Sequence, residues 1–275
     1  MTGRHTVVTG GSRGIGAEVA RTLASRGATV TLIGRDAQAL EQTRQGLPGE
    51  GHRTVALDVA DPEAWPRAAA ELGAVHGLVT AAGVLAPVGP VGTYDPRDFR
   101  RTLEVNVFGT FLAVHHCLPA IKAVRGSIVT FSGGGGTSPL PRYDAYAASK
   151  AAVIRLTENL AAALREEGVR VNCVAPGFVA TEMHAATLQA GPARSGQEYF
   201  ARTERQLAEG GVPASEAAEL VALLLDSQPR FTGKVVSAQW DPWRDPEFRR
   251  RLEQEAELGT LRRIDDHFFY AREPA

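Results

Sequence analysis

Short runs of apolar and β-branched residues alternate along the chain with longer stretches in which apolar positions recur every three or four residues. Most of the short runs are apolar without interruption, which is typical of strands buried on both faces of a parallel sheet. In one longer stretch, Val153, Leu156, Leu160 and Leu164 form a single helical stripe. The pattern predicts an α/β fold, a doubly wound, parallel, seven-stranded sheet in a three-layer sandwich, whose ligand site lies beyond the carboxyl ends of the strands. The seven expected strands are residues 6–8, 29–33, 54–57, 77–80, 127–131, 169–174 and 233–237.

Two segments interrupt this alternation. Residues 182–213 are rich in Ala, Gly, Glu and Arg, and they form either a substrate loop or lid or a set of plain solvated helices. Residues 241–275 are expected to form a helical C-terminal tail on the same domain or on a neighbouring subunit, with Asp245 as its N-cap and Gly259 at the end of the helix. We therefore expect one domain, residues 1–240, with a helical C-terminal extension.

The composition narrows the class of protein. The 275 residues include 30 basic and 31 acidic side chains, so the chain lacks the charge expected of a protein that binds nucleic acid or an anionic membrane. The two cysteines, Cys117 and Cys173, lie in apolar stretches, which excludes a disulfide framework and favours a reducing compartment. No apolar run approaches the ~18 residues of a membrane span. We expect a soluble, cytoplasmic protein.

A glycine-rich turn, Thr9-Gly10-Gly11-Ser12-Arg13-Gly14-Ile15-Gly16, follows the first strand and opens a helix. Glycines permit a tight turn and a close approach of the backbone to a pyrophosphate, and the helix N-terminus offers unpaired N–H groups to the phosphates. A glycine cluster alone is more often an ordinary loop, but its place between a strand and a one-faced helix predicts a Rossmann-type dinucleotide site. The expected cofactor contacts in this turn are Gly10, Ser12, Arg13, Gly14, Ile15 and Gly16.

The end of the second strand indicates which dinucleotide binds. A carboxylate there would accept hydrogen bonds from a ribose 2′-OH, whereas an arginine would hold a 2′-phosphate. Gly34 stands where the carboxylate is expected, Arg35 follows it, and Arg13 is within reach of the same phosphate. Asp36 favours the opposite conclusion, but one residue further on we interpret it as a helix N-cap. The sequence therefore favours NADP(H) over NAD(H).

Tyr146 and Lys150 lie four residues apart in Tyr146-Ala147-Ala148-Ser149-Lys150, so on a helix they share one face. A neighbouring ammonium stabilises the phenolate and lowers its pKa from near 10, as a general acid/base requires. Only three of the 30 basic residues are lysines, which suggests a need for a compact charge at this place. The alternative is a surface lysine beside a packed tyrosine.

The glycine-rich turn and the Tyr146/Lys150 pair follow each other in the order that is typical of the short-chain dehydrogenase/reductase family, and the chain resembles this family over residues ~5 to 240. The resemblance implies that Tyr146 exchanges the hydroxyl proton while the nicotinamide exchanges hydride with a carbonyl carbon. It implies that Lys150 holds the nicotinamide ribose and that Asn106 binds a water of the proton path, although Asn106 could equally be a helix cap. Asp58 is an implied cofactor contact too, although it could equally be a turn residue at the end of a strand. The other implied cofactor contacts are Val59, Ala81, Ala82, Gly83, Pro176, Gly177, Val179 and Thr181.

Of the three places where the chain departs from the family's pattern, one concerns the catalytic residues. The catalytic serine that the family usually carries thirteen residues before the tyrosine, where it stabilises developing negative charge, is Gly133 here. Ser132 precedes it, and a slip of one residue along a strand turns a side chain to the opposite face. A bulge in the glycine run that follows could turn Ser132 toward the site, and we expect Ser132 to take the role of the catalytic serine. Thr137, Ser138 and glycine N–H groups are the alternatives.

These observations together predict a ketoreductase-type oxidoreductase that interconverts a secondary alcohol and a carbonyl on a small molecule with NADP(H) and without a metal. The alternatives are an NADP(H)-binding regulatory or interaction protein without turnover, and a cofactor-retaining epimerase or dehydratase. The resemblance also implies a homodimer or homotetramer built on the helix near 106–120 and the helix that carries Lys150. We expect the substrate pocket to be bounded by the segment after Ser132, by Arg142 and Tyr143, and by the loop that contains Met183, His184, Tyr199 and Phe200. Four arginines raise the question of an acidic or phosphorylated substrate, against the alternative of a solvated face: Arg142, Arg194, Arg202 and Arg205.

Overall fold

In the computed structural model, which describes residues 1–226 and 230–262, the described chain forms one parallel sheet of seven strands. Its order is β3-β2-β1-β4-β5-β6-β7, so the strand order reverses between β1 and β4. The predicted fold class is confirmed, and each expected strand is present to within a few residues. The strands are β1 (His5–Thr9), β2 (Thr29–Gly34), β3 (Arg53–Ala56), β4 (Gly77–Thr80), β5 (Ser127–Phe131), β6 (Arg170–Ala175) and β7 (Val235–Ser237).

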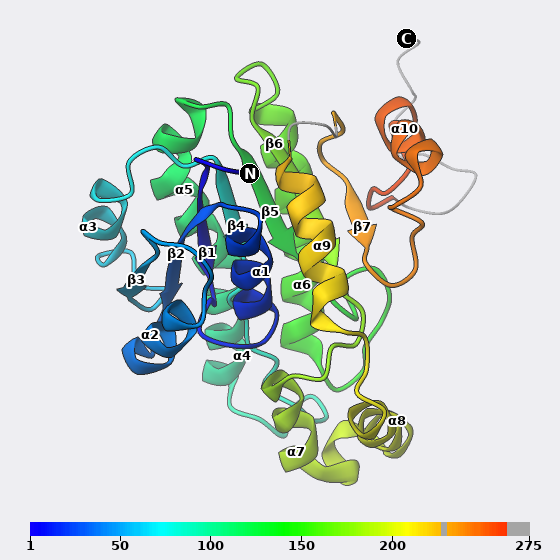
Figure 1. Cartoon of the computed structure of the whole chain (residues 1–275). Coiled ribbons are helices and arrows are strands. Elements are labelled where there is room, and N and C mark those ends of the chain that lie inside the picture. Colours follow the sequence, from blue (N-terminus) through cyan, green and yellow to red (C-terminus); the bar gives the residue numbers. More distant parts are fainter. Residues whose placement is uncertain (227–229, 263–275) are drawn as a thin grey trace.

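Helices cover both faces of the sheet (Figure 1). The helices α1, α2 and α9 pack on one face, and α3, α5 and α6 pack on the other. Described by range, the helices are α1 (Gly14–Ser25), α2 (Ala37–Gln45), α3 (Trp65–Ala70), α4 (Pro96–Leu103), α5 (Gly109–Lys122), α6 (Asp144–Ala163), α7 (Ala185–Ser195), α8 (Gln197–Ala208), α9 (Ala214–Leu225) and α10 (Pro246–Gln254), with a π-helical turn η1 (Glu104–Phe108) and a 3-10 turn η2 (Glu182–His184).

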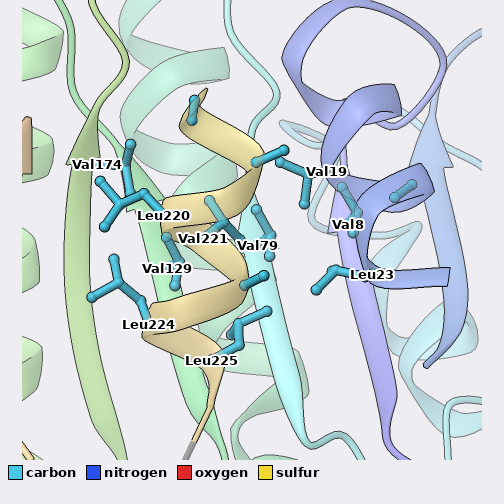
Figure 2. Close-up of a cluster of buried hydrophobic side chains, with 14 of the residues drawn as sticks. Val8, Val19, Leu23, Val79, Val129, Val174, Leu220, Val221, Leu224 and Leu225 are labelled. Atoms are coloured by element: carbon cyan, nitrogen blue, oxygen red, sulfur yellow. The ribbon is translucent and has the colours of Figure 1, made fainter. Parts of the chain in front are cut away.

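The first core cluster shows why these sequences take these places. Along α9, Leu220 and Leu224 recur at helical spacing, and both are completely buried. They face Val129 and Val174 on the central strands, as Figure 2 shows. Burial of each such side chain contributes about 1.5–3 kcal/mol. This packing fixes the sheet as a rigid base, so the loops at the carboxyl ends of its strands are held in place.

Residues 182–213, which interrupt the strand–helix alternation, fold largely as α7 and α8, and they lie beyond the carboxyl ends of the strands (Figure 1). Two guanidiniums attach α7 to the domain. Arg142 donates to the carbonyls of Ala193 (2.8 Å) and Arg194 (3.0 Å) at the end of α7. Arg194 donates in turn to the carbonyls of Val88 (3.1 Å) and Thr93 (3.3 Å). We call α7 and α8 together the cap.

The tail begins as predicted and ends earlier. The Asp245 side chain accepts from the backbone N–H of Glu247 and so caps α10. The expectation that the helix reaches Gly259 is wrong, because α10 ends at Gln254. The chain beyond it is held by the buried Lys234, whose ammonium donates to the carbonyls of Glu255, Ala256 and Leu258 at 2.7–3.0 Å. The expected tail residues 263–275 lie outside the described residues.

Candidate active site

The glycine-rich turn is packed against the loop that follows β4. A Cβ at Gly10, whose φ is +68°, would lie 2.7 Å from the backbone nitrogen of Ala82, and one at Gly16 would lie 2.2 Å from the carbonyl oxygen of Gly10. No larger residue fits either place without moving the backbone. Arg13 is the N-cap of α1 and makes no side-chain cap, so the first N–H groups of the helix have no intrahelical acceptor. The turn therefore has the shape and the donors that a pyrophosphate requires.

The expected site for a 2′-phosphate is open. The nearest neighbours of a Cβ at Gly34 would be Leu40 and the Ser12 hydroxyl at 3.5 to 3.8 Å, which is ordinary contact, and Arg35 is exposed beside it. The Asp36 side chain accepts from the N–H of Ala39 at 3.0 Å, which confirms its interpretation as an N-cap. Arg13, expected to reach the same phosphate, instead forms an exposed ion pair with Glu182 at 2.5 Å.

The third strand ends at the residues expected near the adenine. Asp58 accepts from the N–H of Ala60 at 3.0 Å and forms an ion pair with Arg101 of α4. Burial works to raise the pKa of the Asp58 carboxyl, but these two donors outweigh it and hold the pKa below its ordinary value. Val59 is buried against Gly109, where a Cβ would be 2.8 Å from the valine side chain. Sequence reasoning missed Arg101, for which no local signal exists.

Three of the expected residues meet at the carboxyl end of β4. A Cβ at Gly83 would be 3.3 Å from Asn106 Oδ1, 3.7 Å from Lys150 Nζ and 3.8 Å from Met183 Cε. This convergence joins the loop after β4, the π-helical turn η1, helix α6 and the turn η2 at one point. A larger residue at 83 would therefore cover the side chains of Asn106 and Lys150.

Asn106 is held rigidly in this place. Its Oδ1 accepts from the N–H of Val84 at 2.8 Å, and its Nδ2 donates to the Val84 carbonyl and to Ser149 Oγ, each at 2.9 Å. The residue lies inside η1 and is not a helix cap, which excludes that alternative. Single π-helical turns are common at functional sites. Ser149, which the sequence analysis did not single out, thus ties the asparagine to the helix that carries Tyr146 and Lys150.

Lys150 and Tyr146 are both buried on α6. The Lys150 ammonium donates to the carbonyl of Phe131 at 3.0 Å and lies 5.6 Å from the centroid of the Tyr146 ring. Burial lowers the pKa of Lys150 to about 8. Burial also raises the pKa of Tyr146, and the nearby Tyr199 phenol adds to this rise. The expected lowering of the Tyr146 pKa is therefore not what the structure gives, because loss of hydration outweighs the attraction of an ammonium that is directed to a carbonyl.

Gly133, and not Ser132, faces the tyrosine. A Cβ at residue 133 would be only 2.2 Å from Tyr146 Oη, whereas Ser132 Oγ lies on the side of Gly136, 2.4 Å from where a Cβ at 136 would be. The expected role of Ser132 is thus not supported by its orientation, since no bulge reverses the alternation of side chains. Thr137 and Ser138 are exposed in a shallow groove beside Leu261. The N–H groups of Gly133 and Gly134 donate to no other described residue. Glycine N–H groups therefore stay a candidate for the role of the missing serine.

An apolar cluster stands next to Tyr146 and includes three residues that the sequence analysis expected around the substrate. Tyr143 is completely buried, with its ring centroid 4.6 Å from that of Tyr199, and Met183 packs beside them. Leu85 and Val88, which carried no signal in the sequence, complete the buried part of this cluster. His184, also expected at the pocket, is not part of this cluster. Its ring stacks on that of Phe178 with the ring centroids 4.0 Å apart.

Two classes of site find no support within the described ranges 1–226 and 230–262. No three residues among the histidines, cysteines and acidic side chains there come together as metal ligands. None of the helices described above combines the length and the apolar character that a membrane crossing demands.

Comparison with known proteins gives one consistent result. Residues 4–191 match the family model described as short chain dehydrogenase. The chain is 38% identical over 189 residues, 66% of its length and 76% of the relative's, to cis-4-hydroxycyclohexanecarboxylate dehydrogenase of Sinomonas cyclohexanicum. It is 40% identical over 189 residues, 66% and 74% of the two chains, to galactitol 2-dehydrogenase (L-tagatose-forming) of Cereibacter sphaeroides. NAD⁺-bound xylitol dehydrogenase superimposes with a TM-score of 0.77 at 26% identity, covering 86% of this chain and 97% of that one.

Proposed function

This chain belongs to the short-chain dehydrogenase/reductase family, and on that premise we propose that it interconverts a secondary alcohol and a carbonyl on a small molecule by hydride transfer with NADP(H). The observation that carries the proposal is the convergence of Gly83, Asn106 and Lys150 at one point beside the glycine-rich turn, with Tyr146 one helical turn away. Relatives in the family act on alcohols of different skeletons, and their names include a ring alcohol and a sugar alcohol.

The described residues fit a nicotinamide dinucleotide. Gly10 and Gly16 leave room for the pyrophosphate where a Cβ would collide, and Gly34 leaves room at the adenosine ribose. We assign the 2′-phosphate to Arg35 and the Ser12 hydroxyl, with Arg13 joining when it leaves Glu182. The bound cofactor supplies or accepts the hydride. The remaining assigned contacts follow the loops at the strand ends: Asp58, Val59, Ala81, Ala82, Gly83, Pro176, Gly177, Val179 and Thr181.

Tyr146 moves the proton that accompanies the hydride. In the reducing direction, the carbonyl carbon receives the hydride and the carbonyl oxygen receives the proton from Tyr146 Oη. Burial raises the pKa of this phenol, so it holds its proton at neutral pH and is ready to act as the acid. Lys150, with a pKa of about 8, is close enough to neutrality to return a proton to Tyr146 after this step and to regain one from the side of Asn106. The open N–H groups of Gly133 and Gly134 take the place of the missing serine hydroxyl.

The surface beside the site supports assembly with a second copy. Leu103, Val107 and Leu156 line an apolar groove between η1 and α6, and its rim carries the exposed Phe108 and Phe111. Such a patch favours a protein contact over water. We propose a homodimer or homotetramer through these helices, and sedimentation equilibrium tests it.

The test of the function is NADPH oxidation, followed by absorbance, over a panel of ketones. A substrate-dependent loss of NADPH supports the proposal. NADPH binding without NADPH oxidation by any carbonyl compound would favour the alternative of a regulatory protein. That alternative is based on Gly133, which stands where the family carries its catalytic serine. Product formation without net change in NADPH would favour an epimerase or dehydratase.

A further inference from the structure

The four arginines around the cap have different surroundings. Arg142 and Arg194 are committed to backbone carbonyls and serve to attach α7 to the domain. Arg205 is exposed on α8. Arg202, one turn before it, lies over the ring of Tyr199 with its Cζ 4.8 Å from the ring centroid. No carboxylate in residues 1–226 or 230–262 lies within ion-pair distance of Arg202, so its charge is balanced by none of the described acids.

Tyr199 connects this cation to the catalytic tyrosine. Its ring lies 4.6 Å, centroid to centroid, from the ring of Tyr143, and both tyrosines pack in the cluster that contains Tyr146. Burial raises the pKa of both Tyr199 and Tyr143, and the positive charge of Arg202 acts against this larger effect to lower both. The cation therefore stands at the outer edge of the cluster, one aromatic ring away from the buried part.

The side chains beside Tyr146 on the way to Arg202 are apolar. Leu85, Val88 and Met183 lie beside Tyr146, and Ala186 and Ala190 of α7 pack on the same cluster. Apolar side chains favour contact with a hydrocarbon body and offer few partners to a polyhydroxylated chain, whose hydroxyls would lose hydrogen bonds to water. A substrate that reaches from Tyr146 to Arg202 would therefore contact apolar side chains along its middle.

We propose that Arg202 binds a carboxylate of the substrate, which is a keto acid or hydroxy acid whose reacting carbon and carboxylate are separated by an apolar, ring-sized body. This inference rests on the proposed function and adds the substrate class to it. A guanidinium suits the role because it binds a carboxylate through two parallel hydrogen bonds, and its stacking on Tyr199 holds the plane in position.

The experiment compares two ketones of one skeleton, 4-oxocyclohexanecarboxylate and its methyl ester, as substrates for NADPH oxidation. For the wild-type protein we expect kcat/KM to be about 10- to 100-fold higher for the acid, which is the usual effect of a charged hydrogen bond. Arg202→Gln should reduce this acid-to-ester ratio to near one, mainly through KM of the acid. Arg202→Lys, which keeps the charge without the planar fork, should restore part of it.

Arg205→Gln is the matched control, because it removes an equally exposed arginine one turn along α8 and should keep the wild-type ratio. A wild-type ratio of one or less overturns the inference and leaves the proposed function standing, as does an unchanged ratio in Arg202→Gln. Equal loss of the ratio in Arg205→Gln also overturns it, because the effect would then come from the general charge of the helix. Absence of turnover with every ketone overturns both proposals.

Discussion

Replacement of Gly133 by alanine tests whether the position of the Tyr146 hydroxyl requires a residue without a side chain at 133. The new Cβ would be 2.2 Å from Tyr146 Oη and 3.2 Å from Cζ. Real Cβ contacts under 3.0 Å are essentially never seen, so Oη must retreat by about 1 Å. A misplacement of about 1 Å in a reacting group costs on the order of 100-fold in rate. We therefore expect kcat of Gly133→Ala to fall about 100-fold.

The assay is steady-state NADPH oxidation with any ketone that the wild-type protein reduces, with cofactor affinity measured separately by fluorescence. Gly134→Ala is the control, because a Cβ at 134 meets nothing within 4 Å and alanine keeps the backbone N–H group of residue 134. The control should retain wild-type kcat, and both variants should bind NADPH normally. A Gly133→Ala variant with kcat within about threefold of wild type would refute the reasoning, as would an equal loss in the control.

Two further predictions concern the cofactor and the buried lysine. Arg35→Ala should weaken NADPH binding by roughly 10-fold or more and leave NADH binding unchanged, because only the 2′-phosphate contact is removed; equal weakening of both cofactors in a fluorescence titration would contradict the assignment. Lys150 has a folded-state pKa of about 8, below its ordinary 10.5, so between these pH values the unfolded chain binds more protons and this group makes the protein more stable as pH rises. Urea unfolding from pH 7 to pH 10 should show this rise in wild type and lose it in Lys150→Met; parallel curves would show that the lysine is not desolvated.

The sequence was sufficient for features that depend on local pattern. Uninterrupted apolar runs gave the strands, and the turn after β1 was placed correctly because glycine at positions 10 and 16 answers a backbone requirement that the structure shows directly. The Asp36 and Asp245 caps follow from the same kind of short-range hydrogen bond. These features need no knowledge of distant residues.

Features that depend on distant contacts could not be predicted in this way. The chain after α10 is held by the Lys234 ammonium, which lies just before β7, and the Arg13–Glu182 pair joins residues 169 positions apart. The direction of the Tyr146 pKa shift depends on how deeply α6 and the cap bury the phenol, and spacing along a helix does not report that depth. The opposite orientations of Ser132 and Gly133 follow from the pleat of β5, which the sequence analysis recognised but could not weigh against a bulge.

The most direct test of the central claim, that Tyr146 donates the proton which accompanies hydride transfer, is single-turnover oxidation of NADPH bound to Tyr146→Phe. Loss of the Oη proton should slow ketone-dependent decay of NADPH absorbance by at least about 100-fold while the Kd for NADPH stays at its wild-type value. Decay at the wild-type rate in this variant would contradict the account, because the proton would then come from another group.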